Sequence, residues 1–240
     1  MSNIQIFKNF AEFIKSNYVS TLILTILMAL LYSIPTGNPL GLLIIIIYLT
    51  LCQTFLVFFG KKFLLFENRS DYFLKTVNMF EKNNKPLLKE SFFISLGFTF
   101  GIILIYIFFM ILIALVPEFK ELILQLSFNL YINLIFSDAF YKILIFLFVS
   151  NYFMFFIYKE MILSNKFFTG FKKSFLIFNP LFYIKNIRFK YLKTIVIWTI
   201  ISTILDLSNN VWLITSYIYT IYTAMLISSL LYHEQNQKSK

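Results

Sequence analysis

The sequence has few of the groups that carry chemistry in proteins. Its 240 residues include one cysteine and one histidine, and Lys, Arg, Asp and Glu together make up 13%, against about 25% in soluble domains. The single cysteine, Cys52, excludes an intramolecular disulfide and a cysteine-based metal site. The single histidine, His233, lies in a polar tail, 233–240, that we expect to be disordered and without a catalytic role.

Enzyme signatures are also missing. Ser174 has no histidine with which to form a triad, and no Walker or dinucleotide-binding motif is present. The acidic residues Glu160 and Asp206 are predicted at opposite faces of a membrane, so they cannot act as an acid/base pair. We therefore expect no catalytic residue, no metal ligand, no cofactor and no enzymatic activity.

Apolar residues are abundant instead. They form 59% of the chain, with 32 Phe and 15 Tyr, and the mean hydropathy is +0.79. A soluble fold cannot hide this much apolar surface, whereas lipid-facing and interfacial positions accommodate it. The net charge of +10 is spread over loops between apolar runs, so the sequence argues for a membrane protein and against a nucleic-acid partner.

The apolar runs predict an all-α fold, a polytopic transmembrane helical bundle forming one integral membrane domain, 1–240. Runs near 20 residues cross about 30 Å of hydrocarbon, and Pro86 could open the helix that leads into the third of them. Three hairpins, within 1–60, 61–158 and 159–232, would each follow a basic amphipathic segment. The six predicted spans are 18–34, 40–59, 92–116, 139–158, 191–207 and 211–232; the amphipathic segments are 1–17, 61–90, 122–137 (re-entrant or interfacial, on the outer side) and 159–190.

The distribution of basic residues predicts the orientation. Of the 21 Lys and Arg residues, 19 lie in the N-terminal segment, the two long connectors and the tail, and only Lys120 and Lys142 fall on the opposite side. The positive-inside rule then places both termini in the cytoplasm, in a multi-pass protein of the cell membrane.

The stretch Lys159–Lys193 is the most basic part of the chain, with eight Lys and Arg residues and one acid. On a helix over 166–179, five phenylalanines share one face and Lys166 and Lys173 lie opposite, which predicts a helix lying flat at the inner membrane surface. The basic residues are either topology signals alone or contacts to anionic inner-leaflet lipids. The candidate lipid contacts are Lys166, Lys172, Lys173, Lys185, Arg188 and Lys190.

Small and polar residues inside the spans predict helix packing. Gly97 and Gly101 form a GxxxG pattern beside Ser95 and Thr99, which suits close helix contact within the chain or, alternatively, a dimer face. Gln53 and Asn151 are the intramembrane polar residues; interhelical hydrogen bonds explain them more simply than a transport pathway does.

The segment Thr169–Phe175, TGFKKSF, followed by an Asn-Pro break and more basic residues, resembles a signature of six-helix prokaryotic membrane proteins. These are related to the membrane domain of glycerophosphoryl diester phosphodiesterases. Gly170 matches an alanine of the signature, Lys172 and Lys173 match its basic pair, and Ser174 matches its serine; Gly for Ala and Lys for Arg are departures. The resemblance is clearest from residue 139 onward and implies a six-helix membrane domain. The catalytic barrel of some members is absent, so their activity does not carry over.

These observations predict a non-enzymatic multi-pass membrane protein that acts as a scaffold, an accessory subunit or a lipid-contacting factor. Its expected partners are the lipid bilayer, in particular anionic inner-leaflet lipids, and another membrane protein. A small transporter or permease component is the alternative, and an immunity protein against a membrane-active toxin is also compatible with the sequence.

Overall fold

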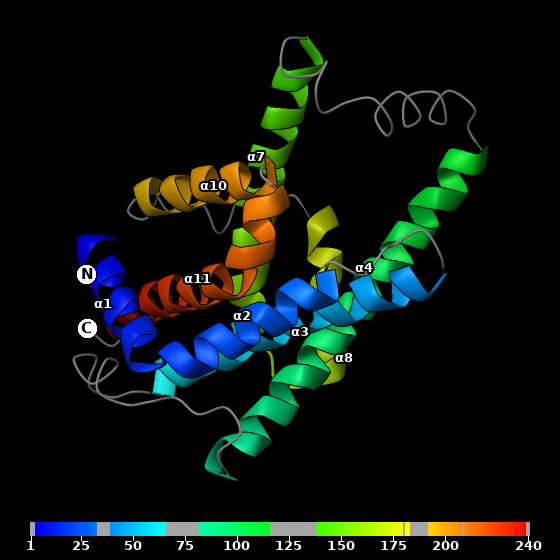
Figure 1. The fold of residues 1–240 in the computed structure, drawn as a ribbon. Helices are drawn as coiled ribbons and strands as arrows, with labels where there is room; N and C mark the ends of the chain where they lie inside the picture. The colour runs from blue at the N-terminus through cyan, green and yellow to red at the C-terminus, as the bar shows by residue number, and fades with distance from the viewer. Residues whose placement is uncertain are drawn as a thin grey trace.

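The structure, a computed structural model, describes residues 3–32, 39–65, 82–115, 138–179, 181–182, 192–207 and 209–238. Every regular element in these ranges is helical (Figure 1), which confirms the all-α prediction. The predicted segment 122–137 lies outside the described residues. The helices are α1 (Asn3–Ser16), α2 (Tyr18–Tyr32), α3 (Pro39–Leu65), α4 (Lys85–Leu115), α7 (Asp138–Ile162), α8 (Phe167–Ser174), α10 (Leu192–Leu207) and α11 (Asn209–Lys238), with short 3₁₀ turns η2 (Lys82–Asn84) and η3 (Phe175–Phe178).

Several helices extend beyond the apolar runs that predict them. Helix α4 begins at Lys85, so Pro86 stands in its first turn as expected, where its missing N–H costs no hydrogen bond. Helix α11 continues to Lys238, so the prediction of a disordered tail from residue 233 is wrong at least to residue 238. The tail residues Glu, Gln and Lys are good helix formers, and adding residues to an existing helix is easier than starting one.

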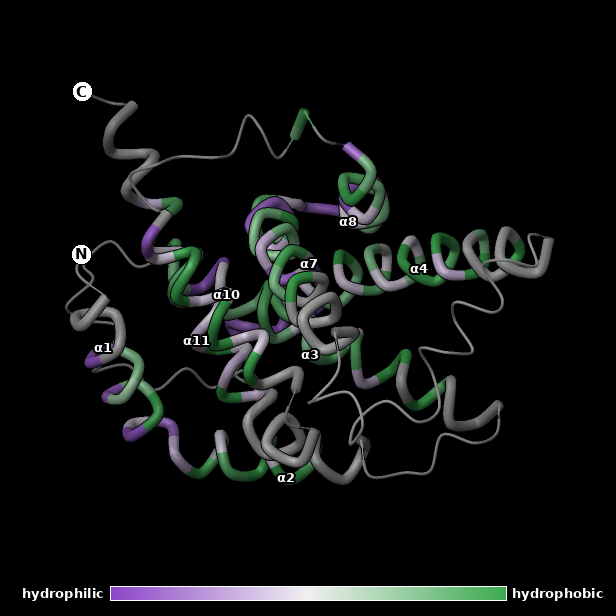
Figure 2. The backbone as a smooth tube through the Cα atoms, turned by 90° about the horizontal axis from the view of Figure 1, so that it is seen from above, coloured by the Kyte–Doolittle hydropathy of each residue, from purple (hydrophilic) through white to green (hydrophobic). Residues whose placement is uncertain are grey.

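Two described helical stretches are long and apolar enough to cross a membrane. They are Ile46–Leu65, in α3, and Lys82–Phe108, in η2 and α4, with 20 and 27 residues, or about 30 and 40 Å of helix. Figure 2 shows hydrophobic residues along most of the described length of α4. Shorter apolar stretches lie at Lys193–Ile204 and Tyr217–Tyr232.

Two of the three predicted hairpins have their helices in contact, α2 with α3 and α10 with α11, but the principal contacts of the fold lie elsewhere. Helix α4 packs mainly on α8 and α3, α3 packs on α11, and α7 packs on α10, whereas α4 and α7 are not principal partners. Figure 1 shows α4 crossing α3. The reason lies on α4, where small residues let α8 approach more closely than a bulky helix face would allow.

Neighbouring helices alternate in direction. Thr50 lies beside Thr99 and Lys61 beside Glu90, so α3 and α4 run antiparallel. α7 and α10 are also antiparallel, because Asn151 contacts Thr203 and Phe155 contacts Trp198. In contrast, α3 and α11 run parallel, because Phe55 contacts Tyr217 and Gly60 contacts Ser228. As a result the C-terminal part of α3 meets the N-terminal part of α4, and Ser164, just after α7, contacts Lys61 at the same end.

Aromatic side chains fill the core between these helices. Phe13 of α1 stands edge-on to Phe59 and Phe63 of α3, at 5.8 and 5.4 Å between ring centroids. Phe155 of α7 meets Trp198 of α10 at 5.1 Å. Such pairs add about 0.5–1.5 kcal/mol beyond the area they bury, so α1 is held firmly on the end of α3.

Candidate functional site

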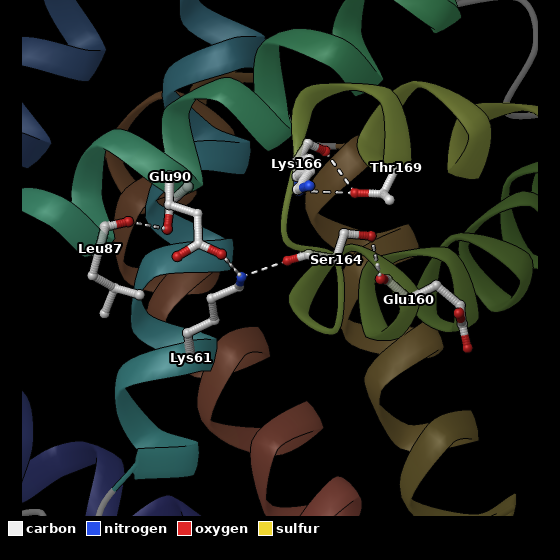
Figure 3. A network of polar contacts seen from close by, with 8 residues as sticks. Lys61, Leu87, Glu90, Glu160, Ser164, Lys166 and Thr169 are labelled. Carbon is white, nitrogen blue, oxygen red and sulfur yellow. Dashed lines mark hydrogen bonds and ion pairs between the residues drawn. The ribbon is translucent and has the colours of Figure 1, made fainter.

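Charged side chains gather where α3, α4, α7 and α8 meet, and we call Lys61, Glu90, Glu160, Ser164 and Lys173 the polar junction. Figure 3 shows four of these residues, Lys61, Glu90, Glu160 and Ser164. The Lys61 Nζ lies 2.8 Å from Glu90 Oε1 and also donates to the backbone carbonyl oxygen of Ser164. The Lys61 side chain is only 11% exposed. One ammonium group therefore ties the end of α3 to α4 and to the segment that follows α7.

A second ion pair completes the polar junction. The Lys173 Nζ on α8 lies 2.6 Å from Glu160 Oε2 on α7. The Ser164 hydroxyl donates to the Glu160 carbonyl oxygen at 2.9 Å and so closes the end of α7. Each carboxylate of the junction faces a lysine, which is the condition under which partly buried charges are tolerated.

The arrangement is that of a structural clamp. Each ion pair joins two elements, α3 with α4 and α7 with α8. Within the described ranges no cluster of three or more His, Cys, Asp or Glu side chains could hold a metal ion. The chemistry that the junction can perform is to fix helix ends against one another.

Helix α8 is seated on α4 through residues without bulky side chains. Gly97, Gly101, Gly170 and Ser174 are all buried. A Cβ built on Gly97 would stand well under 3.0 Å from the Phe167 carbonyl oxygen, and one on Gly170 would meet the Ile94 carbonyl oxygen as closely. A Cβ on Gly101 would collide with the Ser174 side chain. Both glycines of the GxxxG pattern thus face α8 of the same chain.

Sequence reasoning missed the other half of this contact. Gly170 and Ser174 stand four residues apart on α8 and repeat the small-xxx-small spacing of Gly97 and Gly101. That spacing was the available signal. It was overlooked because both residues were interpreted only as parts of a signature and of an interfacial helix.

The ends of α8 explain why it is short. The Thr169 hydroxyl accepts a hydrogen bond from the Lys166 N–H at 3.0 Å and donates to the Lys166 carbonyl at 2.6 Å, which fixes the start (Figure 3). After Ser174 the chain tightens into η3, so the single helix predicted over 166–179 is wrong in its last turn. Asn179 Oδ1 then accepts from the Phe182 N–H at 3.2 Å, as expected for a break before proline.

The structure separates the six candidate lipid contacts. Lys166 and Lys172 are exposed, whereas Lys173 is paired with Glu160 inside the polar junction. Lys185, Arg188 and Lys190 lie outside the described residues. Moreover, α8 packs beside residues 94–101 of α4, which come after the last charged residue of α4. This position differs from the predicted one, in which the helix lies flat on the membrane surface away from the other helices.

The polar residues inside the apolar helices face one another. The Thr99 hydroxyl donates to Gln53 Oε1 at 2.9 Å, and the Thr50 and Thr99 hydroxyl oxygens lie 3.1 Å apart. Asn151 Nδ2 donates to Thr203 Oγ1 at 3.4 Å. Ser95 is buried, and its hydroxyl finds no partner among the described residues.

Replacing Gln53 or Asn151 by Leu should lower the free energy of unfolding by about 1 kcal/mol or less, the range measured for hydrogen bonds between helices in lipid. Denaturant titration of the protein in bicelles would measure it. A loss of several kcal/mol for either variant would contradict a role limited to one such bond.

The chain matches no protein-family model, no curated protein and no solved structure. The resemblance of Thr169–Phe175 to the six-helix membrane proteins therefore stays a prediction. In the structure this segment forms most of α8 and the start of η3.

Proposed function

We propose that the chain is a non-enzymatic multi-pass membrane protein with six spans and cytoplasmic termini, acting as a scaffold or accessory factor that contacts lipid. The observation that carries this proposal is the large apolar surface of α4. Eight of its bulky apolar side chains are at least 39% exposed, and each would gain about 1.5–3 kcal/mol on leaving water. The eight are Phe92, Phe93, Phe100, Leu104, Tyr106, Ile107, Phe108 and Ile111.

The helix directions support the same topology. α3 and α4 run antiparallel, and so do α7 and α10, as consecutive crossings of a bilayer require. The polar junction gathers charged residues at one end of α3, α4 and α7, where a six-span topology places the cytoplasmic surface. Helix α1 packs against that end of α3 as well, which agrees with a cytoplasmic N-terminus.

Single-cysteine labelling in intact cells tests the topology. In a Cys52→Ala background, cysteine at Ser70 or Asn165 should be protected from an impermeant maleimide, and cysteine at Asn209 should react. Asn165 is chosen because it is exposed and, unlike Thr169, does not fix the start of α8. Reaction at Ser70 or Asn165 before cell lysis would overturn the proposed orientation.

A small transporter is the second candidate, because hydrogen-bonded polar groups cross between α3 and α4 at Thr50, Gln53 and Thr99. Because these side chains form hydrogen bonds with one another, a structural role explains them more simply than a transport pathway does. If Gln53→Leu left the protein folded but abolished an ion or solute flux in proteoliposomes, the transporter function would replace the scaffold.

A further inference from the structure

Three side chains form one outward edge that runs from α8 into η3, namely Phe168 and Lys172 of α8 and Phe175, the first residue of η3. They stand at positions i, i+4 and i+7 and therefore share one face of the helical path. All three are exposed, Phe168 by 71%. The opposite side of α8 carries Gly170 and Ser174, which are buried against α4.

The two adjacent lysines of α8 have different surroundings. Lys173 is 31% exposed and its charge is neutralised by Glu160. Lys172 points about 100° away around the helix, and no ion pair among the described residues reaches it or Lys166. An uncompensated ammonium group thus stands between two exposed aromatic rings.

The rings of this edge are supported from within α8. Phe168 meets Phe167 at 5.5 Å between ring centroids, and Phe175 meets Phe171 at 5.2 Å, both edge-on. Phe171 in turn lies 6.1 Å from Phe100 of α4. The apolar part of the edge therefore continues onto the exposed face of α4, beside the lysine.

We propose that the edge of Phe168, Lys172 and Phe175 is a binding site for an anionic phospholipid, whose phosphate contacts Lys172 and whose acyl chains lie along the rings. This inference rests on the proposed membrane function and names a ligand for it. A ligand for this surface must carry a negative charge for Lys172 and an extended apolar part for the two rings. An anionic phospholipid has both, in its phosphate group and its acyl chains. Lys173 is instead a positioning residue that holds α8 on α7.

The test uses the full-length protein reconstituted in symmetric vesicles of phosphatidylcholine with a minor fraction of phosphatidylglycerol, the anionic lipid that basic residues attract. A photoreactive benzoylphenylalanine replaces Phe175, and mass spectrometry counts the lipid adducts. The reference position is Ile111, which is exposed on α4 about 15 Å along the helix from Gly101. At low salt, adducts at position 175 should be enriched in phosphatidylglycerol about five-fold over those at position 111.

Lys172→Gln should reduce this enrichment to the value at position 111, whereas Lys172→Arg should retain it. Lys15→Gln, which removes the same charge from an exposed position of α1, should leave it unchanged. The enrichment should also shrink as salt rises. Equal ratios at positions 175 and 111, or equal ratios with and without Lys172, would overturn the proposal.

Two further results separate the possible failures. If soluble glycerol phosphate displaced the phosphatidylglycerol adducts, the site would belong to a free phosphate compound and the lipid assignment would fall. If alkaline carbonate released the protein from cell membranes, the proposed membrane function itself would fail. Retention in the membrane without lipid enrichment would overturn only this inference.

Discussion

Adding one methyl group at Gly97 should lower the free energy of unfolding by about 2 kcal/mol. A new Cβ there meets the backbone carbonyl of Phe167, which cannot rotate away, and overpacking of this kind costs about 1–3 kcal/mol. Alanine regains up to about 1 kcal/mol of helix propensity over glycine. Denaturant titration of Gly97→Ala in bicelles would measure the net loss.

Gly60 supplies the matched control, because it is also a buried helical glycine of the same chain. The atoms nearest to a Cβ at Gly60 all belong to the side chain of Ile162, which can change its rotamer, whereas a backbone carbonyl cannot. Gly60→Ala should therefore change the unfolding free energy by less than about 1 kcal/mol, since propensity offsets the contact. Equal losses at Gly60 and Gly97 would contradict the backbone contact between α4 and α8.

A larger side chain at Gly97 should release α8 altogether. In a Cys52→Ala background, a cysteine replacing Ser174, which is 0% exposed, should be protected from maleimide. The same cysteine should react once Gly97→Leu is added, because leucine cannot occupy the space of the Phe167 backbone. Continued protection would show that α8 is held by other contacts.

Lys61→Met should destabilise the protein by about 2 kcal/mol. It leaves the Glu90 carboxylate without its partner and the Ser164 carbonyl without a donor. Breaking a buried ion pair costs about 3–5 kcal/mol, but the Glu90 side chain is 35% exposed, so water recovers part of this. The loss should appear in the same denaturant titration.

An exposed lysine of α4 is the control for this prediction. Lys89 is exposed one position before Glu90, so Lys89→Met removes the same charge and should cost about 1 kcal/mol or less. Adding Glu90→Leu to Lys61→Met should cost less than the sum of the two single changes, by about 1 kcal/mol, as expected for residues in contact. Additive effects would show that the ion pair contributes nothing measurable.

The sequence predicted the elements of this structure well, for a local reason. Helical hydrogen bonds join residues four apart, so apolar runs of sufficient length and a proline at the start of α4 indicate where helices form. The same local rule explains the error at the C-terminus. Helix formation depends on propensity as well as hydropathy, and the residues after Tyr232 favour a helix although they are polar.

The candidate site was predicted less completely. The GxxxG pattern of Gly97 and Gly101 indicates that some backbone approaches α4 closely, but spacing alone does not identify the partner. Likewise, Lys172 and Lys173 are identical residues with the same charge, so the sequence alone does not distinguish their surroundings. The rotation of about 100° between consecutive helical residues separates the two side chains, but the sequence does not show which of them faces Glu160 of α7.

By itself, the sequence determined that this protein is built from helices and that α3 and α4 are apolar enough to cross a membrane. Only the tertiary structure decided that α4 packs with α8 and not with α7, and that Glu160 neutralises Lys173 while Lys172 stays exposed. Secondary structure is set by neighbours along the chain, whereas the environment of a side chain is set by helices distant in sequence. Their positions depend on which surfaces fit most closely.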